Sequence, residues 1–224
     1  MRKVCLRAQK NKFVYGGFLS HAKLKDFRCR HDSARVLSNA DDSEKLCNLI
    51  KCSFPYNKHL HILDACAGVG GDTIQFHASG FFKSIVAVEL DALNYVDLQH
   101  NVNQTQRLCQ SSTSIECLLT SCLDILPVHR QNVVYLDVPW IESDVQGGRL
   151  QLMLGKEKIQ DVLARMTNSM PEVYILKIPK NWCHLQRNEI ELDWCTQVYY
   201  GRKFNWCFLW CLSKTGSVLH RKVE

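Results

Sequence analysis

The feature that most constrains the fold is a regular alternation of short apolar runs with helical patterns from His59 onward. The runs are rich in branched and aromatic residues, as β-strands are. The seven expected strands are His61–Ala65, Ser84–Glu89, Ile115–Leu119, Val133–Asp137, Val173–Ile178, Thr196–Tyr200 and Trp206–Leu212. Several are apolar on both faces, as expected for a parallel sheet with helices on both faces. The alternation therefore predicts an α/β fold.

Two apolar stripes with helical spacing lie between these strands. The earlier stripe contains Leu93, Tyr95, Leu98 and Val102, and the later one contains Ile159, Val162, Leu163 and Met166. The last two strands are separated only by Gly201–Asn205, which predicts an antiparallel pair. Seven strands that end in such a pair are typical of a Rossmann-like methyltransferase sheet rather than of a dinucleotide dehydrogenase.

Residues 1–58 differ from the rest because they are mixed and basic and show no strand pattern. One helix is expected from near Asp42 to Lys51, with Asp41 or Asp42 as its N-cap. We therefore expect two parts: a short, partly helical N-terminal extension over 1–58 that helps to close over cofactor and substrate, and one α/β domain over 59–224.

The chain carries 28 Lys and Arg against 22 Asp and Glu, a net charge of +6, which suits a polyanionic partner. Its 12 cysteines never form a Cys-x-x-Cys pair, and no secretory signal opens the chain. They are expected to be reduced, in an intracellular protein of the nucleus or cytoplasm. The nine histidines show no metal-ligand spacing, so no metal site is expected. No apolar run approaches the ~18 residues of a membrane span, so no membrane partner is expected.

A glycine-rich turn follows the first expected strand, in the segment Leu63-Asp64-Ala65-Cys66-Ala67-Gly68-Val69-Gly70-Gly71-Asp72-Thr73. Such a turn between a strand and a helix brings a ligand close to bare backbone. Asp64 stands just before it, where it would repel a pyrophosphate but accept a hydrogen bond from the amino group of a methionine-like ligand. Glu89 ends the second strand, where an acid can accept both ribose hydroxyls of an adenosine ligand. Asp91 is expected to be the N-cap of the helix that follows rather than a ligand contact.

The fourth expected strand ends in Asp137-Val138-Pro139-Trp140. Open α/β folds bind ligands at the carboxyl ends of their strands, and amino-methylating enzymes place an Asp/Asn/Ser-Pro-Pro-aromatic segment at this strand end. An exocyclic amine is a poor nucleophile because its lone pair is delocalised into the base. A carboxylate and a carbonyl that accept its N–H bonds can aim that lone pair, and the aromatic ring stacks on the base.

Together these segments resemble the trimethylguanosine synthases, class I S-adenosylmethionine-dependent enzymes that methylate the exocyclic N2 of 7-methylguanosine RNA caps. The glycine segment through Phe76 is similar to the family's Asp-Ala-Phe-Cys-Gly-Val-Gly-Gly-Asn-Thr-Ile-Gln-Phe. The Asp137 segment stands where the family has Ser-Pro-Pro-Trp, and Leu176-Lys177-Ile178-Pro179-Lys180-Asn181 is similar to its Leu-Pro-Arg-Asn. The resemblance covers about Ser38 to Asn181.

The resemblance implies that S-adenosylmethionine is the cofactor. The residues that would hold it are Asp64, Gly68, Gly70, Thr73 and Glu89, with Ser121 at the adenine and Ser38 upstream. Ser121 is chosen because the acid usual after the third strand is missing.

The resemblance also implies the substrate side of the site. Asp137 and Pro139 would line the methyl-transfer site, and Trp140 would stack on the cationic 7-methylguanine. The other substrate-binding candidates are Lys180, which replaces the family's Arg and would reach the cap phosphates, Asn181, Arg30 and Trp182. Trp182 would form the second side of an aromatic sandwich, although packing is an equal alternative for it.

The expected function is methylation of the guanine N2 of capped RNA towards 2,2,7-trimethylguanosine, by a monomer with capped RNA as its partner. Two alternatives stay open. Asp137 replaces the family's Ser and is more typical of adenine-N6 methyltransferases that act on RNA or DNA. A catalytically silent fold that only binds caps or RNA is the second. Because the chain is short for the family, a partner protein is expected to recruit the RNA.

Overall fold

The computed structural model describes residues 26–30, 37–55, 59–138, 140–141, 151–164, 166, 171–179, 194–200 and 204–211. All seven expected strands form, and the bounds differ from the predicted ones by no more than two residues. They are β1 (His61–Asp64), β2 (Ser84–Glu89), β3 (Ser114–Leu119), β4 (Val133–Leu136), β8 (Val173–Pro179), β9 (Trp194–Tyr200) and β10 (Phe204–Cys211).

These strands form one seven-stranded sheet in the order β3-β2-β1-β4-β8-β10-β9. β1 with β2, β2 with β3 and β4 with β8 are parallel. β10 is antiparallel to both β8 and β9, which confirms the predicted final pair. The Rossmann-like α/β class predicted from the sequence is confirmed.

The chain divides into two compact units, Met1–Cys122 and Leu123–Glu224. The expected division into an extension over 1–58 and a domain over 59–224 stays a prediction. Among the described residues, no helix combines the length and the apolar character that crossing a membrane requires.

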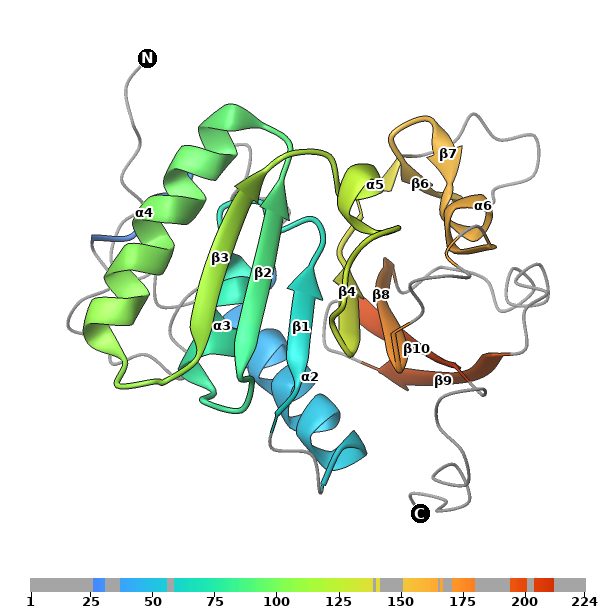
Figure 1. Ribbon diagram of the computed structural model, residues 1–224, viewed down its shortest axis with the longest axis horizontal. Coiled ribbons are helices and arrows are strands. Elements are labelled where there is room, and N and C mark those ends of the chain that lie inside the picture. The colour runs from blue at the N-terminus through green and yellow to red at the C-terminus, as the bar shows by residue number, and fades with distance from the viewer. Residues whose placement is uncertain are drawn as a thin grey trace. The chain divides into compact units, whose positions relative to one another are not determined.

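The first unit contains three parallel strands, β1 to β3, and the helices α2 (Ala40–Ser53), α3 (Gly71–Ala78) and α4 (Ala92–Leu108). α3 packs against both α2 and α4, and α4 also packs on β2 and β3 (Figure 1). As predicted, Asp91 is the N-cap of α4, where its carboxylate accepts a hydrogen bond from the backbone N–H of Asn94 at 2.7 Å.

Two predictions for these helices are wrong. α2 begins at Ala40 and is capped by Asn39, not by Asp41 or Asp42. The reason is local: the Asn39 side chain accepts from the backbone N–H of Asp42 at 2.8 Å and donates to its carboxylate at 2.6 Å. This reciprocal pair satisfies the helix start.

On α4, Leu93 is 56% exposed, so it does not belong to the buried stripe. The polar Asn101 takes an inner position instead. Its amide donates to the carbonyls of Arg28 and Val69 at 2.7 and 2.8 Å, and it accepts from the Arg28 N–H at 2.7 Å. A side-chain amide can be buried when its hydrogen bonds are all made, so the buried face of α4 could not be found from the spacing of apolar residues alone.

The second unit contains β4, β8, β9 and β10 together with a three-stranded sheet that the sequence analysis did not predict. Its strands are β5 (Trp140–Ile141), β6 (Gln151–Leu154) and β7 (Glu157–Lys158). The helix α6 (Ile159–Ala164) follows β7, and the short α5 (Cys122–Ile125) precedes β4. All four residues of the predicted stripe that begins at Ile159 are buried, including Met166 beyond the helix end.

Candidate functional site

The glycine turn after β1 uses two glycines for two different reasons. Gly68 and Gly70 both have positive φ, at 56° and 91°, a conformation that L side chains rarely adopt. A Cβ on Gly70 would lie 2.8 Å from the Leu98 Cδ1 atom, so this glycine permits close packing against α4. A Cβ on Gly68 would meet nothing within 4 Å. The backbone at Gly68 therefore faces open space, which leaves room for a ligand.

Asp64 ends β1 directly before this turn and is 1% exposed. Its Oδ2 accepts a hydrogen bond from the Thr73 hydroxyl at 2.5 Å. Thr73 is itself fully buried in the first turns of α3. This bond fixes one side of the carboxylate, so the two predicted cofactor residues act together: Thr73 orients Asp64.

Glu89, at the end of β2, connects the glycine loop after β1 with the loop that follows β2. Its Oε2 accepts from the backbone N–H of Gly68 and its Oε1 from the backbone N–H of Asp91, both at 2.7 Å. A carboxylate offers about four acceptor positions, so these two bonds leave it able to accept from ribose hydroxyls as well. Glu89 thus shapes the glycine loop and is placed to bind an adenosine ligand.

Two exposed leucines at this sheet edge were not predicted as site residues. Leu90, directly after Glu89, is 71% exposed, and Leu119, at the end of β3, is 50% exposed. Ser121, predicted at the adenine, follows two residues after Leu119 and is half-buried. Large apolar side chains beside a polar strand end suit the face of an adenine ring. For Leu90, the position directly after the strand-end acid Glu89 was the sequence signal.

Ser38 serves the packing of the helices that support the glycine loop. Its hydroxyl donates to Asp72 Oδ2 at 2.7 Å, and the Ser43 hydroxyl donates to Asp72 Oδ1 at 2.5 Å. Asp72 lies in the first turn of α3 and is 7% exposed. Cofactor binding by Ser38 stays a prediction, and its observed partner is this buried acid.

Arg30 lies beside the loop that follows Glu89. Its guanidinium donates to Asp91 Oδ1 at 2.8 Å and to Asn94 Oδ1 at 2.6 Å. The Asn94 backbone N–H, helped by Arg30, holds the pKa of the Asp91 carboxyl below its usual range. Arg30 therefore braces the start of α4, and its predicted contact with substrate stays a prediction.

In the second unit, the candidate methyl-transfer residue Asp137 follows the fully buried strand β4. Its Oδ2 accepts a hydrogen bond from the Lys177 ammonium at 2.6 Å, with Lys177 1% exposed and Asp137 22% exposed. This role of Lys177 was not predicted from the sequence. The signal was a lysine inside the otherwise apolar strand Val173–Ile178, because a buried lysine requires a partner.

The rest of the predicted substrate side is described only in part. The backbone of Trp140 pairs with Leu152 in the small sheet. Its side chain, and Pro139, Lys180, Asn181 and Trp182, lie outside the described residues, so their roles stay predictions.

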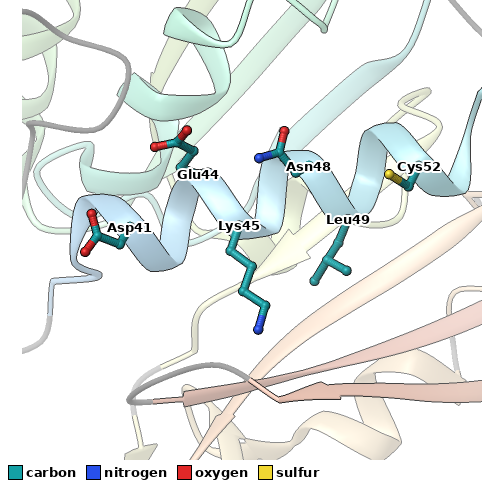
Figure 2. Close-up of a pocket in the computed structure, with 6 residues that line it drawn as sticks. All are labelled: Asp41, Glu44, Lys45, Asn48, Leu49 and Cys52. Atoms are coloured by element: carbon teal, nitrogen blue, oxygen red, sulfur yellow. The ribbon is translucent and has the colours of Figure 1, made fainter.

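The outer face of α2 carries a separate hollow, which Figure 2 shows. It is lined by Asp41, Glu44, Lys45, Asn48, Leu49 and Cys52. None of these is a predicted site residue. Asp41, Glu44 and Lys45 lie on one helix face that is in contact with solvent. The hollow is therefore not part of the candidate site.

Residues 59–194 match the family described as RNA cap guanine-N2 methyltransferase. The chain belongs to this family. The matched segment contains the glycine loop, Glu89 and the Asp137–Lys177 pair, whereas Arg30, Ser38, Ser43 and the hollow on α2 precede it. The family and the fold together imply a class I methyltransferase domain with S-adenosylmethionine as its cofactor.

The chain is also similar to a viral protein. An uncharacterized protein, L320, of Acanthamoeba polyphaga mimivirus is 28% identical over 130 residues, which is 56% of this chain and 48% of that protein. The match therefore spans about half the length of this curated relative.

Solved structures of methyltransferases share the fold. A chain from Porphyromonas gingivalis W83, assigned as a methyltransferase, gives a TM-score of 0.61 at 13% identity, covering 87% of this chain and 45% of that one. A chain from Listeria monocytogenes, assigned to the class I S-adenosylmethionine-dependent methyltransferases, gives 0.52 at 13% identity, covering 75% and 58%. At this level of identity the likeness establishes the fold alone.

The residues at the β1–β2 edge fit S-adenosylmethionine. The open space at Gly68 admits ligand atoms beside the backbone, and Glu89 is an acceptor for the ribose. Asp64, oriented by Thr73, is an acceptor for the amino group, and the exposed Leu90 is apolar surface for the adenine. Each part of the cofactor therefore has a chemically matched group in the first unit.

Proposed function

We propose that this family member transfers a methyl group from S-adenosylmethionine to the exocyclic N2 amine of a 7-methylguanosine RNA cap. The observation that carries the proposal is the match of residues 59–194 to the cap guanine-N2 methyltransferase family, a segment that contains the strand-end carboxylate of Asp137 held by Lys177. A carboxylate at this strand end can accept the N–H bonds of an exocyclic amine and so orient the amine for methyl transfer.

The chain's residues would act by positioning. Asp64 and Glu89 hold the cofactor, while Asp137 accepts an N–H of the target amine and turns its lone pair towards the methyl carbon. S-adenosylmethionine supplies a sulfonium-bound methyl group, which the nitrogen takes up with its lone pair as the carbon–sulfur bond breaks and sulfur keeps that bond's electron pair. The nitrogen becomes cationic in this step, which the Asp137 carboxylate stabilises, and it then releases one proton to solvent.

The cap base itself favours an aromatic partner. The 7-methylguanine ring carries a positive charge, and a cation is attracted to the face of an aromatic ring. We therefore assign the stacking role to Trp140 and phosphate contacts to Lys180. Capped RNA is the substrate under this proposal.

The test is a methyl-transfer assay with labelled S-adenosylmethionine. The substrates are the 7-methylguanosine cap dinucleotide, the unmethylated cap and adenine-containing oligonucleotides, offered side by side. Label on N2 of the 7-methylated cap, lost in Trp140→Ala and in Glu89→Ala, is the expected result.

Two other results would contradict the proposal in different ways. Label on adenine would assign the chain to the N6 reaction. Cap affinity that survives Glu89→Ala without any transfer would identify a binding protein, since cap binding alone has no use for a ribose-holding acid.

A further inference from the structure

Lys177 is a charged side chain in a position where a sheet strand is otherwise apolar. It belongs to β8, it is 1% exposed, and its ammonium lies 2.6 Å from the Asp137 carboxylate. The pairing follows from strand register. Leu136 of β4 is aligned with Leu176 of the parallel strand β8, so the next positions on the two strands are Asp137 and Lys177. Neighbours in register project from the same face of a sheet.

The other neighbour of Lys177 is apolar. In the antiparallel pair of β8 and β10, Lys177 is aligned with Trp206, which is 2% exposed. The lysine thus lies between a buried aromatic residue and the acid. A buried ammonium requires a charged or strongly polar partner, and Asp137 provides one.

The two side chains of the ion pair differ in their exposure to solvent. Lys177 is 1% exposed and Asp137 is 22% exposed, so the anionic end of the pair is the accessible end. An ammonium this close favours the ionised form of a carboxylate. The bond also fixes the direction of the group. Because a carboxylate has about four acceptor positions, it can hold the ammonium and accept N–H bonds from a base as well.

An ionised carboxylate distinguishes the two purines. The Watson–Crick edge of guanine presents two adjacent donors, N1–H and the N2 amine, and both match a group that only accepts. The same edge of adenine presents the N6 amine beside N1, whose lone pair the carboxylate repels. An amide, or a protonated acid, would suit adenine because it both accepts and donates.

We infer that Lys177 is a positioning residue that holds Asp137 as an oriented anion, and that this pair selects guanine over adenine as the methyl acceptor. The inference rests on the proposed function, because it needs Asp137 to face the base. It adds the residue that sets the choice of base: the ion pair with Lys177, and not Asp137 alone, would direct this chain to guanine.

The experiment measures two ratios for the wild-type chain, Lys177→Met and Lys177→Arg. The first is the ratio of dissociation constants for the 7-methylinosine cap and the 7-methylguanosine cap, since inosine keeps N1–H but lacks the N2 amine. A hydrogen bond from an amine to a charged acceptor is worth about tenfold or more in affinity. The second is the ratio of kcat/KM for the 7-methylguanosine cap and for an adenine oligonucleotide.

We expect the wild type to bind the guanine cap about tenfold more tightly than the inosine cap. Lys177→Met should bring this ratio to within about threefold of one and lower the guanine preference in kcat/KM. Lys177→Arg should restore most of both ratios, because arginine keeps the charge and donors. Lys156→Met is the matched control, since Lys156 is an exposed lysine of the same unit, and should leave both ratios unchanged.

Binding of S-adenosylhomocysteine reports whether each variant is folded. If Lys177→Met does not fold, Asp137→Asn tests the same point, because the amide replaces one acceptor with a donor and should also abolish the preference. A folded Lys177→Met or Asp137→Asn with wild-type ratios would overturn the inference alone. A wild-type chain that does not transfer methyl to the guanine cap would overturn the proposed function, and the inference with it.

Discussion

The two positive-φ glycines of the loop after β1 should respond differently to the same substitution. Gly68→Ala and Gly70→Ala each force a Cβ into a left-handed conformation, which costs about 1–2 kcal/mol. At Gly68 that is the whole structural cost, because nothing lies within 4 Å of the new atom. At Gly70 the Cβ would lie 2.8 Å from the Leu98 side chain.

The surroundings of Leu98 decide how large the second cost is. Leu98 is fully buried and packs with Ala67, Ala87 and Val102, so it has little room to move away. Overpacking of this kind costs about 1–3 kcal/mol. We therefore expect Gly70→Ala to lose about 2–5 kcal/mol of unfolding free energy and Gly68→Ala about 1–2 kcal/mol.

For cofactor affinity, Gly68→Ala should have the larger effect and Gly70→Ala the smaller one. The Gly68 Cβ would occupy the open space beside the loop, so Gly68→Ala should weaken S-adenosylmethionine binding at least tenfold, whereas a folded Gly70→Ala should retain more of it. Urea denaturation measures the first quantity and isothermal titration calorimetry the second. Equal destabilisation by the two variants, or wild-type affinity in Gly68→Ala, would refute the assignment of Gly68 to the ligand and of Gly70 to packing.

Three further outcomes are expected. Glu89→Gln should weaken S-adenosylmethionine binding tenfold or more in calorimetry, because an amide cannot accept from two backbone N–H groups and a ribose, whereas the exposed Glu116→Gln is the unaffected control. Asp72→Asn should lose about 1–3 kcal/mol in urea denaturation, since its amide would face a serine hydroxyl donor; an unchanged midpoint would contradict this. Burial lowers the pKa of His77 below its usual value of about 6.5, so the unfolded chain binds a proton at a higher pH than the folded chain does. The free energy of unfolding should therefore decrease as the pH drops below about 6.5, by at most ~1.4 kcal/mol per pH unit. His77→Gln should remove this contribution.

The sheet could be predicted from the sequence because its strands are marked locally. β2 was predicted to the residue, since Ser84–Glu89 is a short apolar run bounded by turn residues. The antiparallel pairing of β9 and β10 followed from the short connection before β10. Asp91 was also predicted correctly as a cap, because capping depends on residues three positions apart.

The interactions that could not be predicted join residues far apart in sequence. Asp137 and Lys177 are 40 positions apart, and only the register of β4 and β8 brings them together. Ser38 was assigned to the cofactor by resemblance, whereas its donor bond to Asp72 depends on how α2 packs against α3. The buried face of α4 depended on Asn101, whose partners Arg28 and Val69 come from two other segments. Periodicity identifies elements, but it does not identify polar partners across a fold.

Glu89 accepts hydrogen bonds from the N–H groups of both Gly68 and Asp91, and this bears on when the two loops become ordered. Because both bonds join groups of the chain itself, they need no ligand atom, and we expect the loops to lose their conformational entropy when the chain folds and not when the cofactor arrives. The Gly68 amide should accordingly exchange its hydrogen slowly in the ligand-free protein. Cofactor association should then be as fast as in a rigid pocket, without the lag of a loop that must first close.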